Sequence, residues 1–140
     1  MWIFDPFQNI FKISRTILYS TSLNINVIGF TEIWLDSHLS HLYNIPGYRL
    51  FVNSRNIHGG GVALYISSDY DLLLQNHLTI SDSFIESFGV EASIATKKYL
   101  FLCIYRPPSG NFGEFISAMN DILSSVYEKK KSGCICSWRF

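Results

Sequence analysis

The stretch FIESFGVEASIATKKYLFLCIYRPP (84–108) decides the fold, because it contains two β-rich runs and then a double proline. In residues 84–95 apolar side chains alternate with polar ones, as in a half-buried strand, and Glu86 breaks the pattern. Residues 98–105 are apolar on both faces, which is typical of a central strand covered on both sides. The two prolines end this strand, because proline cannot donate to a β-ladder. The stretch therefore predicts two consecutive strands and a loop.

Helices and further strands are predicted on either side of this stretch. Downstream, residues 113–131 carry one apolar stripe, which predicts a helix. The lysines at its end would interact favourably with the negative end of the helix dipole. Upstream, the apolar spacing of residues 7–22 also predicts a helix. Three β-rich runs lie between them, at residues 25–30, 48–54 and 61–67. The glycines of RNIHGG (55–60) predict a hairpin between the last two. The pattern indicates one α/β unit without repeats or a linker.

Composition excludes several classes of protein. Apolar residues make up 48% of the chain and charged residues 16%, which indicates a globular domain. The formal net charge is zero, so the chain lacks the excess of basic residues that a free-standing DNA-binding protein usually has. The three cysteines have neither CxxC spacing nor matching histidines, which argues against a zinc site or a disulfide framework and for buried thiols inside the cell. No signal peptide is evident, and the longest apolar run (99–105) is far too short to span a membrane, so we expect no membrane partner.

Two strand ends carry side chains that are suited to binding a metal ion or a phosphate. In FTEIWL (30–35) the carboxylate of Glu32 follows a strand and can hold a divalent cation, although a solvated loop glutamate is the commoner explanation of this motif alone. In IYRPP (104–108) the side chains of Tyr105 and Arg106 leave a strand end, and both can contact a phosphate. Alone, this motif too is more often a simple strand end.

A third motif, GGGV (59–62), precedes a strand and not a helix, so it predicts a hairpin turn and not a phosphate-binding loop. Five features follow one another in the sequence: TEIWL, GY (47–48), Arg55 before GGGVALYI, a strand that ends in YRPP, and a helix. Taken in this order, they resemble the endonuclease domain of non-LTR (LINE- and jockey-type) retrotransposons, which is encoded upstream of the reverse transcriptase, an RNA-directed DNA polymerase. The resemblance covers about residues 24–136. It implies a partial four-layer α/β/β/α sandwich of the exonuclease-endonuclease-phosphatase (DNase I-like) type, with two mixed sheets packed face to face.

The resemblance also implies an activity and a set of site residues. The family uses Mg²⁺ to cleave one strand of DNA, and the 3′-hydroxyl that it leaves primes reverse transcription. Glu32 resembles the metal-binding glutamate, Tyr105 resembles the tyrosine at the scissile phosphate, and Arg106 beside it is a substrate-binding candidate. The family's catalytic asparagine ends a first strand, and Asn9 in FQNI (7–10) is the candidate here, although it lies closer to Glu32 than the family pattern has it and no Arg-Gly or Arg-Ser follows.

The last residues differ from the family in an informative way. After a strand like SGCIC (132–136) the family has Gly-Asp-Phe-Asn, whereas this sequence has SWRF (137–140). Codons TGG AGA TTT, read one base later, give GGA GAT TT, which encodes Gly-Asp-Phe, so residues 137–140 are predicted to be an out-of-frame tail. The chain (1–140) is then an incomplete endonuclease domain that lacks Gly-Asp-Phe-Asn and a later Ser-Asp-His.

Such a fragment is expected to be inactive as it stands, because most of the transition-state donors are missing. DNA is the partner implied by the family, with nuclear action for an intact member and no small-molecule cofactor besides Mg²⁺. The exposed sheet edge predicts aggregation or chaperone contact. Two alternatives remain open: another phosphodiesterase or phosphatase of the same superfamily, and a non-enzymatic interaction module that uses the sheet edge.

Overall fold

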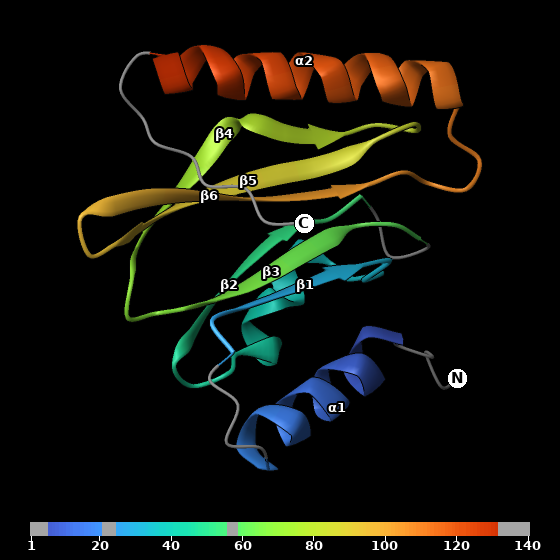
Figure 1. Cartoon of the computed structure of the whole chain (residues 1–140). Helices are drawn as coiled ribbons and strands as arrows, with labels where there is room; N and C mark the ends of the chain where they lie inside the picture. The colour runs from blue at the N-terminus through green and yellow to red at the C-terminus, as the bar shows by residue number, and fades with distance from the viewer. Residues whose placement is uncertain (1–5, 21–24, 56–58, 132–140) are drawn as a thin grey trace. The chain divides into compact units, whose positions relative to one another are not determined.

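The computed structural model describes residues 6–20, 25–55 and 59–131 of the chain. The chain divides into two compact units, residues 1–69 and residues 70–140, and each is described here by itself. Figure 1 shows their elements, which follow one another in this order: α1 (Pro6–Ser20), β1 (Val27–Thr31), the 3-10 helix η1 (Ser37–Tyr43), β2 (Tyr48–Asn53), β3 (Val62–Ser67), β4 (Asp71–Ser81), β5 (Glu86–Ile94), β6 (Lys97–Tyr105) and α2 (Phe112–Lys131).

The first unit contains a three-stranded sheet with β3 in the centre. The strand order is β1-β3-β2, and both pairings are antiparallel. Val62, the first residue of β3, is paired with Thr31 at the end of β1 and with Asn53 at the end of β2. The carboxyl ends of β1 and β2 therefore flank the amino end of β3. This topology brings the residues after β1 beside the glycines that precede β3.

An aromatic core joins α1 to this sheet. Phe7 and Phe11 of α1 are buried, and their rings lie 5.0 Å and 5.3 Å from the ring of Tyr43. The hydroxyl of Tyr65 on β3 donates to the carbonyl of Tyr43, and burial raises the pKa of Tyr65. Each fully buried phenylalanine contributes about 1.5–3 kcal/mol relative to an exposed one. The predicted helix over 7–22 is thus confirmed as α1, held by its apolar stripe.

The second unit contains a sheet in which β5, and not β6, is central. The strand order is β4-β5-β6, and both pairings are antiparallel. The prediction that residues 98–105 form a central strand is therefore wrong for the part of the chain that the structure describes, where β6 is an edge strand. The mixed sheets that the resemblance implies are also not seen, because every pairing among the described strands is antiparallel. Strand β4 and helix η1 were not predicted.

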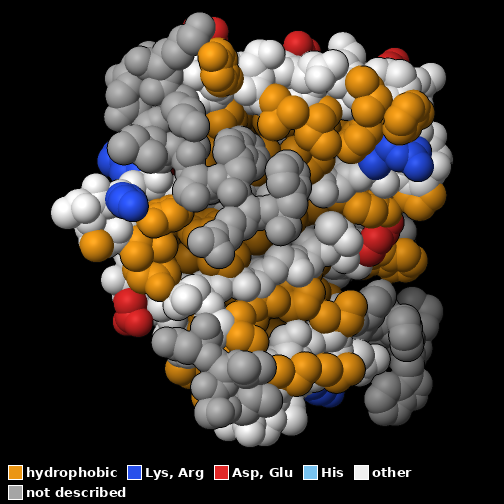
Figure 2. All heavy atoms as spheres, viewed as in Figure 1, with side chains coloured by type: hydrophobic (Ala, Val, Ile, Leu, Met, Phe, Trp, Pro, Cys, Tyr) orange, Lys and Arg blue, Asp and Glu red, His pale blue; other side chains and the backbone are white. Residues whose placement is uncertain are grey.

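Helix α2 packs on one face of this second sheet. Ile122 and Val126 form a buried cluster with Leu78 and Ile85. The side chain of Asn111 caps the helix, because its Oδ1 accepts the backbone N–H of Glu114 at 3.1 Å. Figure 2 shows hydrophobic side chains on the surface of this unit over α2 and its strands. The large exposed ones on α2 are Phe112, Ile116, Leu123 and Tyr127.

The described residues therefore form an α/β protein with two three-stranded antiparallel sheets, two α-helices and one 3-10 helix. Within the described ranges, neither α-helix combines the length and the apolar character that a membrane crossing requires.

Candidate functional site

Glu32, the predicted metal ligand, stands in an unusual backbone conformation directly after β1. Its φ angle is +56°, and that of Trp34 is +48°. A non-glycine residue rarely adopts this left-handed region, and each instance costs on the order of 1–3 kcal/mol. Two such residues therefore lie within three positions. The conformation persists only if neighbouring groups hold it.

The glycine hairpin before β3 supplies these groups. The backbone N–H of Trp34 donates to the carbonyl of Gly60 at 3.0 Å, and that of Ile33 donates to Gly61 at 3.4 Å. Gly60 and Gly61 have φ angles of +76° and +87°, which glycine adopts without strain. A β-carbon on Gly61 would lie only 2.7 Å from Cγ1 of Ile33, whose side chain is fully buried. The TEIWL segment and the glycine hairpin are therefore one packed structure.

This structure fixes the orientation of the Glu32 carboxylate. Its Oε2 accepts the indole N–H of Trp34 at 2.6 Å and the backbone N–H of Gly60 at 3.0 Å. Bonds to a charged acceptor are stronger than neutral ones, and they hold the group in place. A half-buried, oriented carboxylate oxygen is a suitable ligand for a hard divalent cation.

A positive charge lies at the same hairpin. The guanidinium Nη2 of Arg55 is 3.5 Å from the place that a β-carbon on Gly59 would take. Arg55 is exposed, whereas Gly59 is buried. A guanidinium in this position can attract a phosphate group to the hairpin.

The second predicted motif, YRPP, forms the end of β6 and a compact turn. Tyr105 is the last residue of β6 and is half-buried, and its partner across the strand pair is the fully buried Glu86. Arg106 is exposed, and its Nη1 donates to the carbonyl of Gly110 at 3.0 Å. The N–H of Gly110 in turn donates to the carbonyl of Pro107 at 2.9 Å. The predicted loop is confirmed, and its arginine is held against its own turn.

The predicted site residues are distributed over both units. Asn9 lies on the exposed side of α1 in the first unit, which also contains Glu32. Tyr105 and Arg106 belong to the second unit. A shared site for Glu32 and Tyr105 therefore stays a prediction. Among the described residues, no three His, Cys, Asp or Glu side chains gather as a metal cluster. The predicted strand 132–136 and tail 137–140 lie outside the described residues.

The hydrogen-bond partners of Glu32 are not evident from the sequence. Gly60 is 28 positions away along the chain, so its contact with Glu32 depends on the pairing of β1 with β3. The available signals were the tryptophan two residues after the glutamate and three consecutive glycines directly before a β-rich run. Neither signal indicates a contact until the register of the sheet is known.

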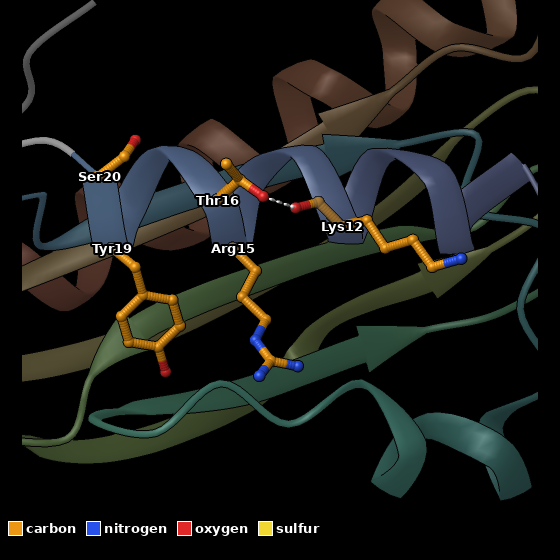
Figure 3. A pocket seen from close by; sticks show the side chains of 5 residues that line it. All are labelled: Lys12, Arg15, Thr16, Tyr19 and Ser20. Atoms are coloured by element: carbon orange, nitrogen blue, oxygen red, sulfur yellow. Dashed lines mark hydrogen bonds between the residues drawn. The ribbon is translucent and has the colours of Figure 1, made fainter.

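A shallow hollow lies on the surface of α1, away from these motifs in the sequence (Figure 3). Arg15 and Tyr19 extend to the same side of the helix, with the guanidinium carbon 5.8 Å from the ring centre, and the hydroxyl of Thr16 donates to the carbonyl of Lys12 at 2.9 Å. The described residues that line the hollow come from this one helix: Lys12, Arg15, Thr16, Tyr19 and Ser20. Two exposed cations on a single helix face do not by themselves make a binding site.

Comparisons with known proteins leave the geometry as the main guide to function. A scan against protein-family models finds no match, and a search of curated proteins finds none either.

Proposed function

We propose that the chain is part of a Mg²⁺-dependent DNA endonuclease of the non-LTR retrotransposon type, in which Glu32 binds the metal ion. The observation that carries this proposal is the clamp on Glu32: a strained backbone, a glycine hairpin packed against it and two hydrogen bonds on one carboxylate oxygen. A surface glutamate that serves only solubility has no need of such a clamp. Strained, tightly supported residues cluster at functional sites.

The residues present fit the metal in donor type. Mg²⁺ prefers carboxylate oxygens and keeps several waters, so one well-placed carboxylate is an appropriate protein ligand. When bound, Mg²⁺ would neutralise the phosphate and stabilise the leaving oxygen. Around it, we assign the hydroxyl of Tyr105 to a hydrogen bond with a phosphate oxygen and the guanidinium of Arg106 to the backbone of the DNA. Asn9 lies on the exposed face of α1 and is given no role at the phosphate.

The chain carries only part of the proposed site. Its sequence contains neither Gly-Asp-Phe-Asn nor Ser-Asp-His, the two motifs that would complete the site in the family it resembles. A single carboxylate and a tyrosine supply neither the general base nor the other transition-state donors. We therefore expect the chain by itself to bind the metal ion weakly and not to cleave DNA.

The proposed fold is the partial four-layer α/β/β/α sandwich. The architecture of each unit supports this proposal, because each contains a three-stranded sheet with a helix packed on one of its faces. In the proposed fold the two sheets would lie face to face, with α1 and α2 outside.

Paramagnetic NMR tests the metal site directly on the full chain. Mn²⁺ in place of Mg²⁺ should selectively broaden the signals of residues 32–34 and 60–61, with a dissociation constant on the order of 1 mM, and added Mg²⁺ should reverse the broadening. Glu32→Gln should abolish this effect, because the amide keeps the shape and can still accept a hydrogen bond but lacks the charge. Glu114→Gln, at an exposed glutamate in the first turn of α2, is the matched control and should leave it unchanged. Equal broadening around Glu32 and Glu114 would reject the proposal.

A further inference from the structure

We propose that Trp34 is a base-stacking residue that holds an unstacked nucleobase of a DNA strand beside Glu32. This inference rests on the proposed function, because it places the base next to the phosphate that a metal ion on Glu32 would contact. It specifies the substrate as a DNA strand with at least one base out of its stack.

The exposure of Trp34 contrasts with that of its neighbours. Its side chain is 41% exposed, whereas Ile33 and Leu35 on either side are 0% and 2% exposed. These two neighbours belong to the aromatic core under α1 and anchor the segment on both sides of the tryptophan. A large apolar ring is thus presented to solvent from a segment that is otherwise buried. Tryptophan in such a position offers a wide π-surface to a ligand.

The orientation of the ring is fixed before any ligand binds. Its indole N–H donates to Oε2 of Glu32 at 2.6 Å, and its backbone N–H donates to Gly60 at 3.0 Å. Its φ angle of +48° places it in a strained region that these bonds maintain. A side chain that is already ordered loses little conformational entropy on binding, which favours affinity. The polar edge of the indole is directed to the carboxylate, so the ring faces are the surface on which a ligand would stack.

Nucleobases are the ligands whose chemistry fits this arrangement. Every base has a π-face, so an aromatic side chain stacks on any base of a strand without reading its sequence. The hydrogen bond between Trp34 and Glu32 keeps the ring beside the proposed cation. A base on the ring and a phosphate at the cation would then belong to the same or adjacent nucleotides. Trp34 would hold the strand in register for the chemistry.

The alternative is that Trp34 only orients Glu32 and never contacts DNA. Two substitutions in the full chain separate these roles. Trp34→Phe removes the N–H donor and keeps an aromatic face, whereas Trp34→Leu removes both. Tyr127→Leu is the matched control, because Tyr127 is an aromatic residue on α2 that is 58% exposed.

The test measures the anisotropy of a fluorescein-labelled short oligothymidylate at low salt, with Mg²⁺ and with EDTA. An abasic oligomer of the same length carries the phosphates without the bases. Trp34→Leu should weaken oligothymidylate binding about 5- to 150-fold, and Trp34→Phe should weaken it less, because an aromatic stack contributes this much affinity. Binding of the abasic oligomer should not depend on Trp34, and Tyr127→Leu should change neither. The effect should persist in EDTA, since stacking does not use the cation.

Three results would overturn the inference: no binding of oligothymidylate, equal binding of both oligomers, or a folded Trp34→Leu variant that binds as the wild type does. If Trp34→Leu does not fold, tryptophan fluorescence decides. The wild type should then show more quenching by oligothymidylate than Trp34→Phe, which retains the other two tryptophans, and equal quenching would reject stacking. If only the metal site fails, binding should still depend on the bases, but the affinity for oligothymidylate should change neither with Mg²⁺ nor in the Glu32→Gln variant.

Discussion

Glu32 and Trp34 support each other through the indole N–H and the carboxylate, and both depend on a backbone conformation that neither residue favours. At the scale of single residues, the sequence predicted Glu32 as a candidate because it follows a β-rich run. It did not predict the contact of Trp34 with Glu32, because a left-handed backbone at a tryptophan has no sequence signature. Asn9 was selected from a motif match alone, and its place on an exposed helix face gives no contact that supports a catalytic role.

Cys103 provides a residue-scale prediction that is independent of function. Burial raises the pKa of its thiol from 9.0 to about 11, so the reactive thiolate is scarce at neutral and mildly basic pH. The neutral thiol is favoured in the fold, so its contribution to stability is complete below pH 9 and is lost as the pH rises toward 11. We expect iodoacetamide at pH 8 to leave Cys103 unmodified in the native chain and to modify it in urea. Peptide mass spectrometry measures both, and rapid modification of the native protein would contradict the burial of this residue.

At the scale of elements, the apolar patterns predicted α1, α2 and five of the strands, whose bounds in the structure differ from the predicted ones by a few residues at most. Strand β4 was missed because its sequence places three leucines in succession and exposes most of its side chains, so it lacks a period of two. Strand β6 was predicted to be central because both its faces are apolar. Its Leu100 and Leu102 face α2, and Cys103 is buried as well. A strand at the edge of a sheet can still have apolar residues on both faces, because its hydrogen-bonded neighbours lie beside it and do not cover its faces.

The glycine hairpin gives an element-scale prediction with a matched control. Gly47 and Gly61 have similar φ angles, +83° and +87°, but a β-carbon would meet nothing within 4 Å at Gly47 and would lie 2.7 Å from Ile33 at Gly61. Gly47→Ala should lower the free energy of unfolding by about 1–2 kcal/mol through backbone strain alone. Gly61→Ala should lower it by about 2–5 kcal/mol, because the clash with a buried side chain adds to the strain. Urea denaturation measures both values, and equal losses would show that the hairpin does not pack against Ile33 as described.

At the scale of the whole molecule, the described chain consists of two antiparallel three-stranded sheets, each with its own helix. The sequence predicted the α/β class correctly, since the alternation of strands and flanking helices is a local property. The pairing of β1 with β3, which builds the Glu32 clamp, depends on long-range register and was beyond a local pattern. Of the proposed site residues, Glu32 belongs to the first unit and Tyr105 to the second. Completion of the site would need the two motifs that the sequence does not contain.

Magnesium-dependent nicking of supercoiled plasmid tests the central claim, that Glu32 is the metal ligand of an incomplete endonuclease site. Three proteins are compared. The first is the 140-residue chain, and the second is a chimera in which residues 1–131 continue into the second half of an intact non-LTR retrotransposon endonuclease, from its Gly-Asp-Phe-Asn strand onward. The third is the same chimera with Glu32→Gln. Cooperative thermal unfolding first establishes that both chimeras fold. We expect no nicking by the chain, nicking by the chimera, and a loss of nicking activity of about 100-fold or more in the Glu32→Gln chimera. Nicking by the chain alone, a folded chimera that does not nick, or nicking that does not change with Glu32→Gln would contradict the central claim.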